Sequence, residues 1–510
     1  MSRRLIQIDQ ENFTVRLREV KDLTPPIEYA TLTHCWGGDS GIQLWRNVAV
    51  QENGLIDMSK APKTLQDAIA LLSALEIPYI WVDALCIDQN SLADWECESA
   101  KMGDIYTYGV INIAATSASD GSGGLFPPAS RMAACPLVLR TNDGRVARFV
   151  LHRREIGDRK WLHEVETTTI NTRGWTLQER ALSPRTVHFG KSQTYWECHQ
   201  GCACDLIPLR DGSPRKLRNL FTEEQCENKH TVKGALEAIW SIIVSSYAQR
   251  NLTKETDKLV ALSGIAGCIA NHLRLDGSDY LAGLWRPTLL SDLCWMPSHI
   301  AWQTGWPDRA PSWTWARLDG TVSMRPPYGS PTFCARVNNV VMSSQEHPFM
   351  GVNKGTLVIQ GPLCAIAPED ASPDDDAGHW RGDEYDWWMY KGIVNNGNYP
   401  FNLDALMMAW DRGSDVWYRD LKQKVKKGEV LYLLLIEHRT LDNGRQTGSA
   451  LVLRRTGEKP AQYERYGIFP ANYIEDDHTI ERLLSFGRNE SLLPSDGYTN
   501  SDKDWGFEIE

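Results

Sequence analysis

A histidine, a cysteine and a tryptophan stand together as His34, Cys35 and Trp36, at the end of an apolar run that predicts a strand over residues 29–35. A cysteine thiolate activated by a histidine base is an arrangement used for acyl transfer. Adjacent strand residues point to opposite faces, so His34 and Cys35 cannot both face one pocket unless the strand breaks there, and one of them needs a partner from elsewhere, such as Cys86 or His188. Alternatively, Cys35 is a small buried apolar residue and His34 a hydrogen-bonded core residue.

A second polar group follows the short apolar strand predicted over residues 79–84, and it contains Asp83, Cys86, Asp88 and Gln89. An aspartate at the carboxyl end of such a strand can bind a ribose hydroxyl or orient a histidine. Aspartates in this position also commonly cap the turn that follows. Both interpretations of Asp83 stay open, with Cys86 and Gln89 as candidate substrate-binding neighbours.

A third group is densely charged around one aromatic side chain and contains Arg173, Trp175, Gln178, Glu179, Arg180 and Arg185. Spacings of three and four place Trp175, Gln178 and Glu179 on one helical face. Arginine binds phosphates through two parallel hydrogen bonds, so Arg173 or Arg180 is a candidate for holding a pyrophosphate. The other interpretation is an ion-pair network that docks this helix onto the sheet.

Three thiols and an imidazole lie close together at Cys198, His199, Cys202 and Cys204. A zinc site usually takes its four ligands from two separated pairs, and no second pair follows nearby. The spacing therefore predicts a cysteine-rich turn without a metal.

Alternating strands and helices must position these groups. The pattern predicts a hairpin over residues 4–17, helices after Pro62 and over residues 94–108, and a further strand over residues 110–115. This order is typical of an α/β fold in which helices cover a parallel sheet. Ligands bind such sheets at the carboxyl ends of the strands, which here carry Cys35-Trp36-Gly37 and Asp83–Gln89.

Composition narrows the class of protein. The 510 residues include 54 lysines and arginines and 65 aspartates and glutamates, a net charge of −11, which argues against a nucleic acid or an anionic membrane as partner. No apolar segment is long enough to span a membrane, no secretory signal is visible, and the 12 cysteines in such a chain indicate reduced thiols. We therefore predict a cytoplasmic protein with a small-molecule substrate, and a homo-oligomer stays open. The 20 tryptophans favour a binding site.

Several longer motifs then occur in a fixed order: YATLTHCWG at 29–37, YIWVDALCIDQ at 79–89, DW at 94–95, DIY at 104–106, GSGGLF at 121–126, RGWTLQER at 173–180 and YWEC at 195–198. Together they resemble the fungal heterokaryon-incompatibility (HET) domain family over about residues 1–205. The segments YLAGLW at 280–285 and APSWTW at 310–315 are similar to the region that often follows this domain.

The resemblance implies a doubly wound parallel sheet distantly similar to Toll/interleukin-1-receptor (TIR) domains. Several TIR relatives hydrolyse NAD with one glutamate, and by similarity Glu98 is that carboxylate, with Trp95 stacking on the nicotinamide. NAD is then a substrate, and no cofactor is implied with certainty. The competing interpretation is that Glu98 is a surface residue or pairs with an arginine such as Arg173.

The chain is expected to divide into a HET domain (1–205), a helical Trp- and Pro-rich segment (206–330) and a β-rich C-terminal region (331–510), with an acidic loop at 368–376 and a hairpin turn at 442–444. No Walker-type phosphate-binding sequence is present. Three functions stay open: a nucleotide-binding protein that hydrolyses NAD through Glu98, a biosynthetic enzyme of secondary metabolism that uses Cys35 or His34 for acyl transfer, cyclisation or proton transfer, and a non-enzymatic cell-death interaction module.

Overall fold

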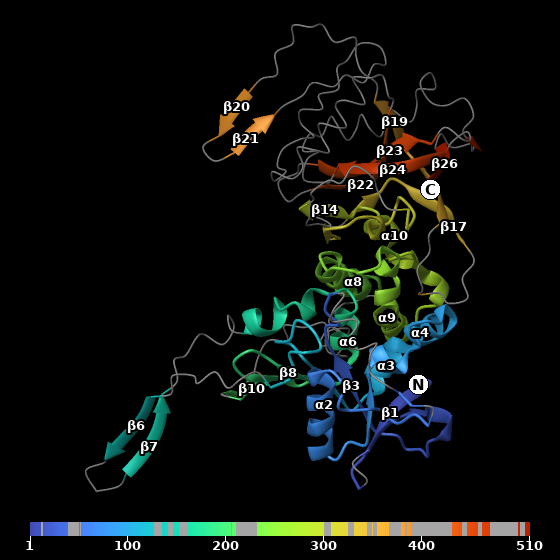
Figure 1. The fold of residues 1–510 in the computed structure, drawn as a ribbon. Helices are drawn as coiled ribbons and strands as arrows, with labels where there is room; N and C mark the ends of the chain where they lie inside the picture. Colours follow the sequence, from blue (N-terminus) through green and yellow to red (C-terminus); the bar gives the residue numbers. More distant parts are fainter. Residues whose placement is uncertain are drawn as a thin grey trace. The chain divides into compact units, whose positions relative to one another are not determined.

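The structure is a computed structural model (Figure 1). It describes residues 1–11, 14–38, 50–51, 53–126, 135–140, 146–151, 161–205, 207–210, 232–299, 308–324, 331–343, 349, 354–366, 379–382, 385–388, 431–440, 446–456, 462–469, 498–499 and 505–509. The predicted acidic loop and the predicted turn at 442–444 lie outside these residues. The chain divides into two compact units, and the second includes Lys229–Gln249, Lys254–Leu259 and Leu275–Glu510. The predicted division into three segments stays a prediction.

The first unit comprises Met1–Asn228, Arg250–Thr253 and Val260–Arg274 and is built on a nine-stranded sheet. The strands of this sheet are β1 (Arg4–Asp9), β2 (Thr14–Glu19), β3 (Tyr29–Thr33), β4 (Tyr79–Trp81), β5 (Ile111–Ala114), β8 (Arg185–Phe189), β9 (Thr194–Cys198), β10 (Gly201–Cys204) and β11 (Ile207–Arg210). Their order is β11-β10-β9-β8-β5-β3-β4-β1-β2. A separate hairpin joins β6 (Cys135–Arg140) and β7 (Val146–Leu151).

Only the middle of this sheet is parallel. Strand β3 pairs in parallel with β4 and β5, and β5 pairs in parallel with β8, whereas β1, β2, β9, β10 and β11 pair antiparallel. The α/β expectation is confirmed, but the sheet is mixed, because the flanking strands form hairpins with short connections that cannot cross over. The TIR-like character of the sheet stays a prediction.

The helices of the first unit pack beside this sheet and against one another. They are α2 (Lys63–Ala74), α3 (Asp83–Cys86), α4 (Leu92–Tyr108), α6 (Thr176–Leu182) and α9 (Ser263–Leu273). Helices α4, α6 and α9 meet where two glycines touch: a Cβ atom at Gly103 would lie 2.6 Å from the Cα atom of Gly264. Gln178 lies at the same crossing and accepts a hydrogen bond from the Gly264 amide at 3.3 Å. Helix α9 therefore belongs to the first unit and packs against α4 and α6.

The second unit combines helices with another nine-stranded sheet, of order β16-β22-β23-β24-β26-β18-β17, in which β19 pairs with β22 and β25 with β26. The helices are α8 (Val232–Ala248) and α10 (Leu289–Asp292). The strands of the sheet are β16 (Thr332–Phe333), β17 (Arg336–Met342), β18 (Gly355–Gly361), β19 (Leu363–Ile366), β22 (Leu431–Thr440), β23 (Gln446–Arg455), β24 (Gln462–Phe469), β25 (Tyr498–Thr499) and β26 (Trp505–Ile509). The predicted β-rich C-terminal region is confirmed.

The tryptophans of the 280–315 region build the core of the second unit. The indole N–H groups of Trp240 and Trp315 both donate to the Gly283 carbonyl at 2.8 Å, and Trp295 donates to the Trp313 carbonyl at 3.0 Å. Gly283 has a φ of 93°, and a Cβ atom there would lie 3.1 Å from the Trp315 Nε1 atom. Large rings that pack together, several with their indole donors hydrogen-bonded to backbone carbonyls, thus form this core. Among the described residues, no helix is both long enough and apolar enough to cross a membrane.

Candidate functional site

Two of the polar groups singled out in the sequence lie side by side where β3 and β4 end. Strand β3 ends at Thr33, and β4 is its parallel neighbour, so the residues after each strand emerge at one edge of the sheet. The Trp36 indole donates to Asp83 Oδ2 at 3.1 Å, and the His34 Nε2 atom lies 3.7 Å from Asp83 Oδ1. The strand-end prediction for these residues agrees with this geometry.

Arg173 and Glu179 join them from the segment that leads into α6. The Arg173 guanidinium donates to the His34 carbonyl at 2.7 Å and also hydrogen-bonds the Cys35 thiol. Glu179 lies close enough to Asp83 for their charges to interact. We call the following residues the strand-end cluster: His34, Cys35, Trp36, Asp83, Arg173 and Glu179.

Glu179 is the deepest carboxylate of the strand-end cluster, with 6% of its surface exposed. Its Oε2 atom accepts hydrogen bonds from Thr33 Oγ1 at 2.7 Å and from the Tyr106 hydroxyl at 3.0 Å. The pKa of Glu179 is raised to about 7, chiefly by burial and also by the nearby charge of Asp83, while the two hydrogen bonds and Arg173 oppose the shift. A carboxyl group tuned in this way exchanges its proton near neutral pH.

Thr33 and Asn112 extend this hydrogen-bonding chain across the sheet. The hydroxyls of Thr31 and Thr33 each lie 3.1 Å from Asn112 Oδ1, yet the single Thr33 proton is directed to Glu179. The Asn112 Nδ2 atom has no partner among the described residues. Turning the Asn112 amide by 180° lets Nδ2 donate to the threonine oxygens and leaves the Thr33 proton for Glu179.

The thiol and the imidazole of the strand-end cluster are held in their neutral forms. Burial raises the pKa of Cys35, although Arg173 acts in the opposite direction. Burial also lowers the pKa of His34, although Asp83 opposes this shift. A nucleophilic cysteine needs its thiolate. The electrostatics therefore favour the carboxylates over Cys35 as the reactive groups.

Several side chains of the recognised motifs are partly exposed. Trp36, Trp95 and Trp175 are all half-buried, and the rings of Trp95 and Trp175 meet edge to face with centroids 6.4 Å apart. The Asp83 side chain is 26% exposed. Gln89 is exposed and donates to the Asp83 carbonyl at 3.1 Å. The Trp36 indole, half-buried and hydrogen-bonded to the accessible Asp83 carboxylate, is suited to binding a flat ring.

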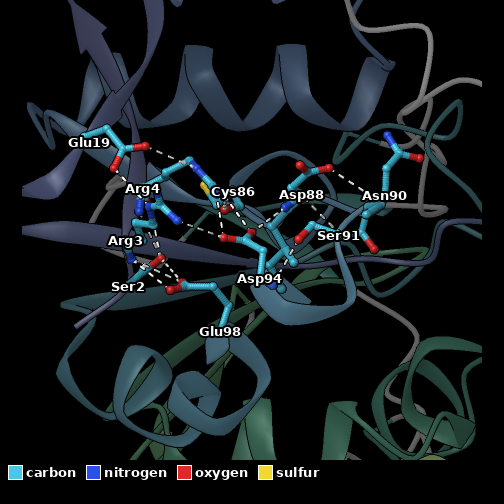
Figure 2. Close-up of polar contacts among 12 residues, drawn as sticks. Ser2, Arg3, Arg4, Glu19, Cys86, Asp88, Asn90, Ser91, Asp94 and Glu98 are labelled. Carbon is cyan, nitrogen blue, oxygen red and sulfur yellow. Dashed lines mark hydrogen bonds and ion pairs between the residues drawn. The ribbon is translucent and has the colours of Figure 1, made fainter. Parts of the chain in front are cut away.

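Glu98 is placed differently, against the N-terminal segment (Figure 2). Its carboxylate is fully buried and accepts hydrogen bonds from the Ser2 hydroxyl at 2.5 Å, the Arg3 amide at 3.1 Å and the Lys101 ammonium at 3.1 Å. Ser2 in turn accepts from the Trp81 indole at 3.0 Å. These contacts join α4 to the start of β1, and the catalytic role of Glu98 stays a prediction.

Arg4 and Asp94 form a second anchor in the same region (Figure 2). The Arg4 guanidinium binds both Asp94 oxygens, at 2.8 and 2.9 Å, and donates to the Cys86 carbonyl at 2.6 Å. The Cys86 thiol is fully buried, and burial raises its pKa to about 12. Cys86 thus meets the N-terminal strand through its backbone, while its thiol stays protonated.

Arg180 and Gln178, two other predicted binding residues, lie inside the packing of α6. Arg180 makes a bidentate pair with Glu166 at 2.8 and 2.9 Å and donates from Nε to Glu197 at 2.9 Å. His188 Nε2 contacts the same Glu197 oxygen at 3.0 Å. This geometry agrees with the ion-pair interpretation of Arg180 rather than with phosphate binding. Gln178 serves the helix crossing at Gly264.

The cysteine-rich motif forms the hairpin of β9 and β10. Cys202 and Cys204 pack against a cluster of Trp161, Val165 and Tyr195. In the part of the chain that the structure describes, no group of three or more His, Cys, Asp and Glu side chains could hold a metal ion.

Sequence reasoning missed Thr33, Tyr106 and Asn112 as supports of Glu179. A signal was present for the threonines, because Thr31 and Thr33 put hydroxyls two residues apart on a wholly buried strand. Tyr106 belongs to a recognised motif, but nothing in its spacing from Glu179 shows that they meet.

The first unit is therefore an α/β domain with a mixed sheet and a polar cluster at the ends of its parallel strands. Residues 29–179 match the family model described as Heterokaryon incompatibility protein (HET). The chain thus carries a HET domain over these residues, as its motifs predicted, and the match includes every member of the strand-end cluster. No curated protein and no solved structure matches the chain.

Proposed function

We propose that this heterokaryon-incompatibility-type protein binds an NAD-like dinucleotide at the strand-end cluster and hydrolyses the bond between ribose and nicotinamide. The observation that carries the proposal is a pair of carboxylates in unequal environments: Asp83 reaches solvent, whereas Glu179 is buried with a pKa raised to about 7 by burial. Two carboxyl groups whose environments differ in this way are typical of glycosidic-bond hydrolysis.

Each member of the strand-end cluster has a role that its contacts support. Asp83 stabilises the positive charge that builds on the ribose as the bond breaks. The Trp36 indole, held by its hydrogen bond to Asp83, stacks on the nicotinamide ring. Arg173 uses part of its five donors on His34 and Cys35, and its guanidinium is the group suited to a phosphate of the dinucleotide.

The proton balance assigns the active form of Glu179. Water adds to the ribose carbon, nicotinamide leaves as a neutral base with the bonding electron pair, and one proton is released. No acid is needed for the leaving group, so the Glu179 carboxylate, as a base, accepts the proton of the attacking water. Glu179 works only when ionised, and the rate is expected to rise with pH through about 7, the value to which burial raises its pKa.

Release of nicotinamide from NAD by the purified full-length protein tests the proposal. Asp83→Asn and Glu179→Gln are expected to reduce the rate by about 100-fold or more, the usual effect of removing a charge-stabilising group or a general base. Glu96→Gln is the matched control, because Glu96 lies exposed on α4. Loss of activity in Glu98→Gln but not in Glu179→Gln would return the role to Glu98.

Variants of the same protein distinguish the other two candidate functions, a biosynthetic enzyme and a non-enzymatic interaction module. A chain that leaves NAD intact but loses another activity in Cys35→Ser would favour a biosynthetic enzyme. A chain without turnover that still kills cells when Asp83 and Glu179 are both replaced would favour an interaction module.

A further inference from the structure

A short segment much later in the chain forms hydrogen bonds with the loop that carries Arg173. Arg250–Thr253, which we call the 250–253 segment, belongs to the first unit. The Asn251 amide donates to the Thr172 carbonyl at 2.7 Å, and the Gly174 amide donates to the Asn251 carbonyl at 2.7 Å. The two hydrogen bonds form a parallel bridge that holds Arg173 between them.

Side chains of the 250–253 segment add further contacts to this loop. The Arg250 guanidinium donates to the Arg173 carbonyl and to Thr176 Oγ1, both at 3.3 Å. The Leu252 side chain fills the space beside Gly174 so closely that a Cβ atom at that glycine would lie 2.5 Å away. The backbone on both sides of Arg173 is thus fixed by hydrogen bonds and by packing.

The position of Arg173 matters to His34, Cys35 and Glu179 of the strand-end cluster. Its guanidinium binds the His34 carbonyl and the Cys35 thiol. Its charge lowers the pKa of Glu179, against the raising effects of burial and of Asp83. It also lowers the pKa of Cys35, against burial and against the charges of Glu179 and Asp120.

We propose that the 250–253 segment is a positioning element for Arg173, which makes the strand-end cluster depend on a part of the chain beyond the matched HET region. The segment begins two residues after α8 ends at Ala248, and α8 belongs to the second unit. The catalytic consequence rests on the proposed function, whereas the positioning of Arg173 does not.

The experiment compares full-length Arg250→Ala and Arg250→Lys with Arg274→Ala, a control at an exposed arginine that follows α9 in the same unit. Hydrogen exchange measured by mass spectrometry is read at the peptide that contains Gly174. Arg250→Ala is expected to accelerate its exchange about tenfold, because the loop opens more often. Arg250→Lys, which keeps the charge and a donor, is expected to restore part of the protection.

The pH dependences of two reactions then report the position of the Arg173 charge. If the 250–253 segment had only a structural role, neither pH dependence would shift. In Arg250→Ala, the alkylation of Cys35 by iodoacetamide, followed at that residue by mass spectrometry, is expected to shift by about half a pH unit toward higher pH. The acidic limb of the NAD hydrolysis profile should shift in the same direction.

The outcomes separate this inference from the proposed function. A wild-type protein that releases no nicotinamide refutes the hydrolase proposal, while exchange at Gly174 and alkylation of Cys35 still test the positioning of Arg173. If Arg250→Ala matches Arg274→Ala in both exchange and alkylation, the 250–253 segment does not position Arg173 and the inference fails.

Discussion

Replacing Glu98 with glutamine tests whether this carboxylate anchors the N-terminal segment. The fully buried side chain receives the Ser2 hydroxyl, the Arg3 amide and the Lys101 ammonium. A glutamine keeps one acceptor oxygen but turns an NH₂ group toward donors. The hydrogen bonds that remain also lose the assistance of the charge.

The expected loss follows from these contacts. A hydrogen bond to a charged group contributes about 1.5–3 kcal/mol and a neutral one about 0.5–1.5 kcal/mol. Losing this charge assistance and leaving one donor without an acceptor is expected to cost Glu98→Gln about 2–3 kcal/mol. Glu98→Ala, which leaves all the donors without their acceptor, is expected to cost about 3–5 kcal/mol. Lys101→Ala is expected to cost less than about 1 kcal/mol, because its side chain is 36% exposed.

Urea unfolding followed by pulse proteolysis measures this, with fragments of the first unit identified by mass spectrometry because the two units need not unfold together. Glu96→Gln, at an exposed position of the same helix, is the control and should stay within about 0.5 kcal/mol of wild type. If Glu98→Gln is as stable as Glu96→Gln but abolishes NAD hydrolysis, the anchoring interpretation is wrong and Glu98 is catalytic.

Three further predictions concern the first unit. Gly103→Ala should destabilise it by about 1–3 kcal/mol through the clash with Gly264, whereas Gly38→Ala, with no atom within 4 Å of its added Cβ, should change the urea midpoint little. Replacing the fully buried Ile265 of α9 with alanine should cost about 2–4 kcal/mol and lower the same midpoint, although Ile265 lies beyond the matched HET region. Between pH 4.5 and 7 the stability of Glu179→Gln relative to wild type should rise by on the order of 3 kcal/mol. The pKa of Glu179 is raised in the folded state to about 7 from 4.5, chiefly by burial, so wild type loses stability over this range as the group ionises in the unfolded chain. Urea unfolding at several pH values measures the difference, and a constant difference would contradict the prediction.

The sequence was sufficient to predict the elements that the local pattern controls. The first hairpin, strands β3, β4 and β5 and helix α4 occur where alternation and helical spacing predicted them. The strand-end rule then pointed to Cys35-Trp36-Gly37 and to Asp83–Gln89, because the carboxyl ends of parallel neighbours emerge at one edge.

The remaining contacts depend on tertiary packing that no local pattern contains. Glu98 meets Ser2 across 96 residues, and Glu179 meets Thr33 across 146 residues. The position of Glu179 follows from how α6 packs against α4 and α9, and α9 comes much later in the chain. The resemblance to TIR enzymes therefore identified Glu98 as a candidate, but it could not show that Glu179, on a different helix, lies close enough to Asp83 for their charges to interact.

The two buried glutamates differ in what their surroundings explain. Glu98 receives three donors, so the fold by itself accounts for a charged group at that position. Glu179 receives only the hydroxyls of Thr33 and Tyr106 among the hydrogen bonds that the described residues make to it, and a neutral glutamine oxygen accepts both equally well. With a pKa raised to about 7, chiefly by burial, the Glu179 carboxyl costs the domain stability as the pH rises toward neutrality, a cost that a neutral glutamine does not carry. A group that costs stability without adding a contact is the mark of a functional site. A Glu179→Gln protein that is more stable at neutral pH and also inactive would show that Glu179 lowers stability and is required for activity.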